Sequence, residues 1–143
     1  MKKRDDRRNF TLMEMLVVMG LIALIASMIG GGYIYYLRSS RPQAAAGIIK
    51  NIELSLGKFY QDMNRFPDPA VGLDELMENV SNDENWKGPY FEAYELPKDP
   101  WGRDFIYTIQ ENGRYLITSY GEDGVEGGTG LNADITNLGI KKQ

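Results

Sequence analysis

The sequence predicts an α+β protein in which one long N-terminal helix precedes a small domain with an antiparallel β-sheet. Three observations indicate this class. Residues 16–37 form a run of 22 without a single charge, and apolar residues then recur at helical spacing over 48–63. Two segments rich in β-branched and aromatic residues, 105–109 and 114–120, flank a Glu-Asn-Gly turn, which is typical of a hairpin. The 143 residues leave room for about one globular domain.

The charge is divided sharply along the chain. Residues 1–9 carry a local charge of +3, the run 16–37 carries none, and residues 38–143 carry −6. An uncharged apolar run of this length suffices to cross a bilayer as a helix, and basic residues before it keep the N-terminus cytoplasmic. The run exceeds the apolar core of a cleaved secretory signal, which is about 7–15 residues long. We therefore expect a transmembrane helix over 10–37 and export of the acidic remainder.

The transmembrane helix is expected to continue as an amphipathic helix over 38–64. Its apolar face recurs at steps of three and four residues: Ile48, Ile52, Leu56, Phe59 and Met63. Two prolines and a glycine soon after Asn64 predict its end. Because glycine and proline weaken helices, we expect a flexible or locally melted stretch around glycines 30–32, ahead of Pro42. Close helix packing is the alternative use of these glycines.

The remaining segment, 65–143, is expected to form a globular head. A short helix is predicted by apolar residues at close spacing: Leu73, Leu76, Met77 and Val80. A turn-rich stretch then carries five aromatic residues: Trp86, Tyr90, Phe91, Tyr94 and Trp101. We expect these rings to fill the core, because a small domain needs large rings to bury enough apolar area. A ligand-binding cluster is the alternative.

Composition excludes most enzyme chemistry. The chain contains no His and no Cys, so imidazole bases, Ser-His-Asp triads, thiol nucleophiles, disulfides and thiolate metal sites are ruled out. The net charge of −4 argues against a nucleic-acid-binding surface, which would need a basic surplus. Paired carboxylates could still act as acid and base, but most acidic residues lie in turn-like sequence. We expect no enzyme and no catalytic residue.

Glu14 interrupts the apolar sequence FTLMEMLVVMG. A carboxylate at bilayer depth costs about 3 kcal/mol. Either Glu14 lies near the cytoplasmic headgroups, or a cation from another chain neutralises it in an assembled state. The surrounding sequence RRNFTLME, followed by the apolar helix, resembles the class III signal of type IV pilins and pseudopilins. The resemblance implies that 1–9 is a prepilin leader peptide and that a membrane peptidase cuts between Asn9 and Phe10.

The same resemblance implies two roles in assembly. The peptidase would methylate the new amine of Phe10, and this charged amine would pair with Glu14 of a neighbouring subunit. Since each charge alone is costly in apolar surroundings, the pair would set the axial stagger between subunits. Asn9 stands where the family usually has Gly before the cut.

The segment 120–135 combines five glycines with several oxygen donors. Calcium takes about six to eight oxygen ligands, and glycines let a backbone curl to supply carbonyls. The segment contains no His or Cys, which disfavours zinc and copper, and the spacing does not match an EF-hand. From the residues alone, a solvated turn and a calcium site both stay open.

A second resemblance covers essentially the whole chain. The order and spacing of four motifs are similar to those of the major pseudopilin of type II secretion systems: RFPDPAVGLDEL, WKGPYF, LPKDPWGRDFIY and SYGEDG. It implies a type IV pilin-like fold and a calcium ion in the last loop. The implied ligands are the side chains of Asp123, Asn132 and Asp134 and the carbonyls of Tyr120 and Val125.

The function implied is a structural subunit of the pseudopilus, a periplasmic filament that drives export of folded proteins across the outer membrane. Implied partners are further copies of the chain, minor pseudopilins, the prepilin peptidase, the inner-membrane platform with its ATPase, and lipid. The implied location is the inner membrane, crossed once, with the head periplasmic. A type IV pilus subunit for adhesion, motility or DNA uptake is the first alternative. A membrane-anchored periplasmic binding module or enzyme is the second.

Overall fold

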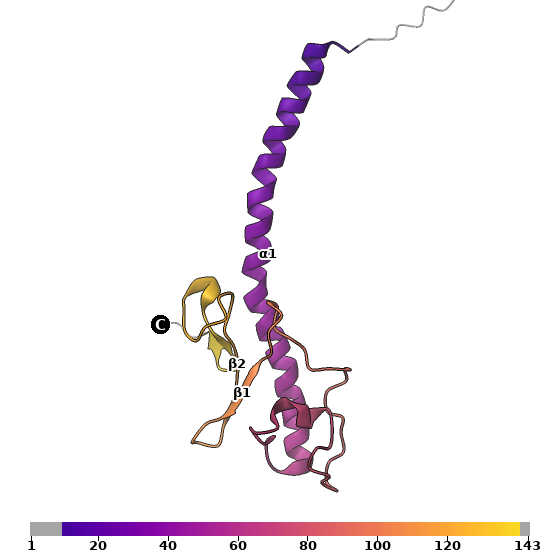
Figure 1. Cartoon of the computed structure of the whole chain (residues 1–143), viewed down its shortest axis with the longest axis vertical. Coiled ribbons are helices and arrows are strands. Elements are labelled where there is room, and N and C mark those ends of the chain that lie inside the picture. Colours follow the sequence, from indigo (N-terminus) through magenta and orange to yellow (C-terminus); the bar gives the residue numbers. More distant parts are fainter. Residues whose placement is uncertain (1–9, 141–143) are drawn as a thin grey trace, which may run out of the picture. The chain divides into compact units, whose positions relative to one another are not determined.

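The computed structural model describes residues 10–140, including all their side chains except those at 29–32 and 34. The predicted leader and cleavage site at 1–9 therefore lie outside the described residues. Two compact units divide the chain, an N-terminal unit (Met1–Arg38) and a head (Ser39–Gln143). Figure 1 shows the elements: α1 (Leu12–Met63), the 3-10 helices η1 (Gly72–Leu76) and η2 (Gly130–Asn132), and the strands β1 (Ile106–Ile109), β2 (Tyr115–Ser119), β3 (Ile135–Thr136) and β4 (Gly139–Ile140).

Helix α1 contributes to both units and is continuous. It passes through glycines 30–32 and through Pro42 without a break, so the expected local melting around 30–32 was wrong. Each glycine costs only about 1 kcal/mol relative to alanine, and once a helix exists each added residue contributes one hydrogen bond. The helical turns on both sides therefore carry the helix across the glycines. Among the described residues, no helix combines the length and apolar character needed to traverse a membrane.

The end of α1 follows the prediction. Asn64 adopts a left-handed conformation with φ of 53°, and its amide donates to the Tyr60 carbonyl at 2.9 Å. Asn tolerates this conformation better than most residues. The Phe66-Pro67 sequence then favours extended backbone, and the chain turns away from the helix.

The core of the head is formed by one stripe of α1 and the sheet. The buried apolar residues of the helix are Ala45, Ile49, Ile52, Leu56 and Phe59, and they form one hydrophobic cluster with Leu73, Leu76, Tyr90, Ile117 and Ile135. The predicted stripe is confirmed at Ile52, Leu56 and Phe59. Ala45 and Ile49 were not predicted and widen it, whereas the predicted Ile48 and Met63 are only partly buried at its margin. The head therefore buries one face of its part of α1 against its own strands and loops.

The sheet contains the predicted hairpin and a second, unpredicted one. The strand order is β1-β2-β3-β4, and every neighbouring pair is antiparallel. Register places Ile106 opposite Thr118 and Ile109 opposite Tyr115, and Gly113, with φ of 76°, closes the turn between β1 and β2. The pair β3–β4 is too short for a periodic pattern to announce it in sequence. The α+β fold class is confirmed.

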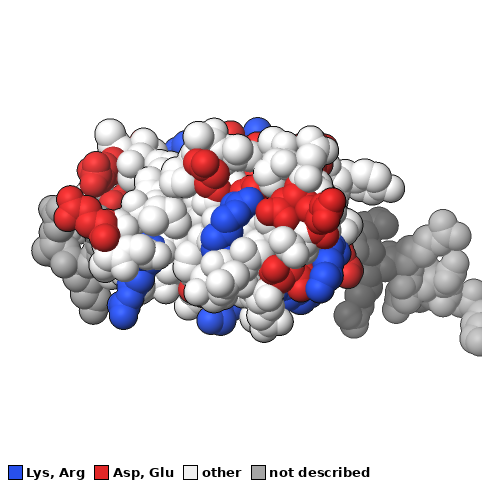
Figure 2. Space-filling model, turned by 90° about the horizontal axis from the view of Figure 1, so that it is seen from below, with Lys and Arg blue, Asp and Glu red and all other residues white. Residues whose placement is uncertain are grey.

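Four of the five aromatic residues of the loops belong to the core or pack against it, as expected. Tyr90 is buried, and Trp86, Phe91 and Trp101 pack against the core. Tyr94 is fully exposed, so its assignment to the core was wrong. The predicted short helix is present in part as the 3-10 helix η1, which contains Leu73 and Leu76 but ends before Met77 and Val80. Figure 2 shows carboxylates and basic side chains interspersed on one face of the molecule, with no broad basic area on that face.

Candidate functional site

Glu14 has partners within its own chain. The Thr11 amide donates to the Glu14 carboxylate at 3.2 Å, the Thr11 hydroxyl donates to the same oxygen at 3.4 Å, and the Glu14 amide donates to the Thr11 hydroxyl at 3.1 Å. This is a capping box, in which the residue before the helix and the third helical residue cap each other. The spacing Thr-x-x-Glu before an apolar run is a sequence signal, and the sequence analysis missed it.

The described side chains of the N-terminal unit form an extended apolar surface. All of its described side chains are exposed, and its large hydrophobic side chains, from Phe10 onward, are between 44% exposed at Leu37 and 80% at Leu12. Soluble monomers rarely leave so extended an apolar surface uncovered, so this surface marks an interaction site.

The segment 120–134 closes on itself into a loop. The Glu122 amide donates to the Leu131 carbonyl at 3.1 Å, and the Gly124 amide donates to the Tyr120 carbonyl at 3.2 Å. Gly121 is buried, with φ of 63°, and a Cβ there would lie 2.8 Å from the Ala133 carbonyl oxygen. Only glycine fits this close approach. The fold thus places the two ends of the loop, around Gly121 and around Asn132, against each other.

Asp134 has the clearest signature of a cation ligand. It is 1% exposed, and its Oδ2 accepts a hydrogen bond from the Gly127 amide at 3.0 Å. Its other oxygen, Oδ1, is buried without a hydrogen-bond partner among the described residues. A buried carboxylate oxygen left unpaired costs free energy. A hard cation would satisfy it, so the residues present fit a calcium ion.

The other predicted ligands lie in more open positions. Asp123, Val125 and Asn132 are exposed, and the Val125 amide donates to the Asp123 carboxylate at 3.2 Å. Within residues 10–140, no group of three or more His, Cys, Asp or Glu side chains is placed to hold a metal ion. A calcium ion at Asp134 would therefore depend on carbonyl and amide oxygens as well as carboxylates.

Asp99 organises the turn beside this loop. It is 4% exposed, and its carboxylate accepts from the amides of Trp101 at 3.0 Å and Arg103 at 2.8 Å and from the Ser119 hydroxyl at 2.7 Å. The turn 99–103 is thus fastened to β2. The side chain of Arg103 reaches out of this turn and donates to the Gly121 carbonyl. The sequence showed the DPWGR motif but gave no sign of these long-range partners.

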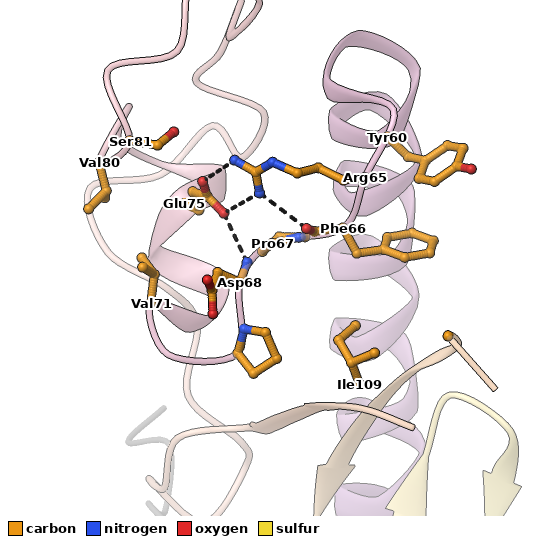
Figure 3. Close-up of a pocket in the computed structure, with 12 residues that line it drawn as sticks. Tyr60, Arg65, Phe66, Pro67, Asp68, Val71, Glu75, Val80, Ser81 and Ile109 are labelled. Carbon is orange, nitrogen blue, oxygen red and sulfur yellow. Dashed lines mark hydrogen bonds and ion pairs between the residues drawn. The ribbon is translucent and has the colours of Figure 1, made fainter. Parts of the chain in front are cut away.

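The head also contains a cavity of about 660 Å³ beside η1, shown in Figure 3. Arg65 donates two hydrogen bonds to Glu75, at 2.6 and 3.0 Å, and the Asp68 amide donates to the same carboxylate at 3.0 Å. The Glu75 side chain is 2% exposed. The Arg65 guanidinium lowers the pKa of Glu75, and Glu75 raises that of Arg65. The two opposite charges neutralise each other, and the pair joins η1 to the segment that follows α1.

Comparisons with known proteins agree with this structure. The family described as type II secretion system (T2SS), protein G matches residues 33–138. The type II secretion system core protein G of Vibrio cholerae is 33% identical over 145 residues, covering 99% of this chain and 98% of that protein. The core protein G of Escherichia coli K12 is 33% identical over 146 residues, covering 100% of this chain and 99% of that protein.

A solved structure carries the same fold. The crystal structure of the major pseudopilin of enterohaemorrhagic Escherichia coli matches with a TM-score of 0.56 and 25% identity, over 73% of this chain and 91% of that one. The resemblance to major pseudopilins is confirmed, and so is the role as a structural subunit of the type II secretion pseudopilus. The chain belongs to the protein G family of type II secretion systems, the family of the major pseudopilins.

Proposed function

We propose that the chain polymerises through its N-terminal unit into a periplasmic filament that drives the export of folded proteins across the outer membrane. The observation that carries this proposal is the apolar surface of the N-terminal unit, where Leu12 is 80% exposed and Leu16 59%. A helix surface with so many exposed apolar side chains is stable only when lipid or other helices cover it. Lipid would cover it before assembly, and neighbouring copies would cover it in the filament.

The route into the filament would begin with processing. A prepilin peptidase would cut between Asn9 and Phe10 and methylate the Phe10 amine. Before assembly the chain would cross the inner membrane once, with its N-terminus cytoplasmic and its head periplasmic. The uncharged run 16–37 and the local charge of +3 over 1–9 support this location and orientation.

Glu14 would be the assembly contact. Its carboxylate already accepts hydrogen bonds from Thr11, but a carboxylate has about four acceptor sites, so a charged amine can join. The Phe10 amine of a neighbouring subunit would supply it. Both charges would be compensated only in one register, which would fix the stagger.

A calcium ion would order the loop 120–134. The side chains of Asp123, Asn132 and Asp134 and the carbonyls of Tyr120 and Val125 would hold it, and the unpartnered Oδ1 of Asp134 supports this assignment. When bound, the ion would supply positive charge to the buried carboxylate and a fixed coordination shell to the loop. Because it would bind only the folded head, it would stabilise the head by mass action.

The proposal includes no enzymatic role and no nucleic-acid partner. The lack of His and Cys and the net charge of −4 support both statements. The proposed protein partners are minor pseudopilins, the prepilin peptidase, and the inner-membrane platform with its ATPase. The match to protein G over residues 33–138 supports secretion rather than a type IV pilus.

The variant Glu14→Ala tests the assembly contact. We expect normal export and a normally folded head, but no incorporation into filaments sheared from cells that overproduce the pseudopilus. Glu111→Ala is the matched control, because Glu111 is an exposed acid in the β1–β2 turn. Filaments formed by Glu14→Ala in normal amounts would contradict the proposal.

A further inference from the structure

Arg103 connects two separate parts of the head. Its guanidinium donates to the Gly121 carbonyl in the loop 120–134. Its Nε lies 3.6 Å from Oδ2 of Asp99, and its guanidinium carbon lies 5.8 Å from the centre of the Trp101 ring. The side chain is 39% exposed, whereas that of Asp99 is 1% exposed. Arg103 is therefore anchored by a buried carboxylate on one side and meets the loop on the other.

Gly124 leaves the space that this guanidinium occupies. A Cβ at Gly124 would lie 2.7 Å from Nη1 of Arg103, and φ at Gly124 is +73°. Gly124 also donates its amide to the Tyr120 carbonyl at 3.2 Å. The first turn of the loop, 120–124, is thus closed by its own backbone and held from outside by Arg103.

We propose that Arg103 is a positioning residue for the calcium loop: it holds the turn 120–124 in place before the ion binds and thereby raises the affinity for calcium. This inference rests on the proposed calcium site. Gly121, which Arg103 contacts, lies between the proposed ligands Tyr120 and Asp123. A loop that is already ordered loses less conformational freedom on binding. Asp99 balances the positive charge of Arg103, which limits repulsion between the guanidinium and the ion.

The guanidinium is well suited to this role. Its planar fork donates in several directions at once, whereas a lysine ammonium is a compact charge on a flexible stem. Arg103→Lys should therefore fail to restore the function even though it keeps the charge. A residue that acted only through its charge would be replaced by lysine without loss.

The first experiment uses the full chain in detergent micelles. Calcium titration calorimetry should show binding that is about five- to tenfold weaker in Arg103→Gln and Arg103→Lys. Lys98→Gln is the matched control, since Lys98 carries the same charge nearby and pairs with Asp104 at 3.8 Å. Its affinity should equal that of the unchanged chain.

A second measurement uses the same variants without calcium. In the presence of EGTA, the amides of Glu122 and Gly124 should exchange with deuterium faster in Arg103→Gln than in the unchanged chain or in Lys98→Gln. A residue that only stabilised the head would lower the melting temperature equally with and without calcium and leave the dissociation constant unchanged.

A double-mutant cycle isolates the contact between Arg103 and Gly124. Gly124→Ala and Gly130→Ala both place a side chain at positive φ, +73° and +63°, but a Cβ at Gly130 meets nothing within 4 Å. Gly124→Ala should weaken calcium binding more than Gly130→Ala does. This difference should disappear in the Arg103→Gln background, because the displaced group is then absent.

The outcomes separate the two proposals. Unchanged or tighter calcium binding by Arg103→Gln would overturn the inference, and tighter binding would mean that the guanidinium competes with the ion. If the unchanged chain bound no calcium, the proposed calcium site would fail. The role in calcium affinity would then fall with the site, and exchange in EGTA would test only whether Arg103 orders the turn: faster exchange at Glu122 and Gly124 would support this ordering, and equal exchange would overturn it.

Discussion

The N-terminal unit and the head use the same helix, α1, in opposite ways. In the N-terminal unit every described side chain is exposed, and most of the large ones are apolar. In the head, α1 buries Ile49, Ile52, Leu56 and Phe59 against the sheet and the loops. A segment can therefore be helical without burying its apolar side chains within its own chain. The head carries its own core, whereas the N-terminal unit needs lipid or neighbouring subunits to cover it.

The sharpest test of this contrast compares one buried and one exposed apolar residue of α1. Phe59 is fully buried and packs edge-to-face on Tyr90, with ring centres 5.3 Å apart. Phe59→Ala should lower the free energy of unfolding of the head by about 4 kcal/mol. Leu24→Ala should change it by less than about 0.5 kcal/mol, since Leu24 is 55% exposed. Urea unfolding in micelles, followed by near-ultraviolet circular dichroism, measures both; equal losses would break the comparison.

The ion pair between Arg65 and Glu75 tests whether polar contacts also hold the head together. Arg65→Met would leave the buried Glu75 charge uncompensated and should cost about 3 kcal/mol. Lys87→Met is the control, because Lys87 is 72% exposed and pairs with Asp62 at 3.5 Å; such surface pairs contribute about 1 kcal/mol or less. The same urea titrations apply. Similar losses in both variants would show that burial of Glu75 does not matter.

Removal of calcium should weaken the head and leave the N-terminal unit unaffected. At a calcium concentration about one hundred times the dissociation constant, chelation should lower the stability of the head by about 2.7 kcal/mol. Differential scanning calorimetry with calcium and with EGTA measures the change. Asp134→Asn should abolish the difference, while Glu126→Gln, at an exposed acid of the loop, should retain it. Equal melting temperatures with calcium and with EGTA would refute the calcium site.

The stability of the head should also depend on pH through Glu75. Its pKa in the folded head lies below the ordinary value of 4.5, chiefly because Arg65 hydrogen-bonds to the carboxylate. The folded state therefore favours the ionised form. The resulting stability is complete above about pH 4.5 and is lost as the pH falls through the folded pKa. Melting temperatures measured down to about pH 3 should fall less steeply for Glu75→Gln, whereas Glu95→Gln, at an exposed acid, should not change the slope.

The smallest expected effect concerns the capping box formed by Thr11 and Glu14 at the start of α1. Thr11→Val should remove the hydroxyl that accepts from the Glu14 amide at 3.1 Å, at a cost of about 1 kcal/mol to the first helical turn. Hydrogen exchange of the Glu14 amide in micelles should become faster. Thr11→Ser keeps the hydroxyl and should exchange like the unchanged chain. Stability of the head should not respond to either substitution.

Local patterns in the sequence predicted the local elements well. Periodicity gave the buried face of α1, and the Glu-Asn-Gly turn between β-rich segments gave the β1–β2 hairpin. The glycines at 30–32 led to a wrong prediction of local melting, because their low helix propensity is outweighed by the helix on both sides. Leader processing and the calcium ligands remain predictions.

Such patterns could not predict contacts between segments that lie far apart in the sequence. Arg65 meets Glu75, and Arg103 meets Gly121, only after the loops have folded, and no spacing in the sequence announces either contact. Tyr94 was assigned to the core from its residue type alone, yet residue type does not say which way a loop side chain points. Thr11 was different, since its capping spacing could have been read directly.

The placement of the two tryptophans has a practical consequence. Trp86 and Trp101 both belong to the head, while the aromatic side chains described in the N-terminal unit are Phe and Tyr. Indole emission therefore reports on the head alone. Tryptophan emission would therefore stay unchanged even if the first half of α1 had lost the lipid or the subunits that cover it. That half requires an optical label of its own.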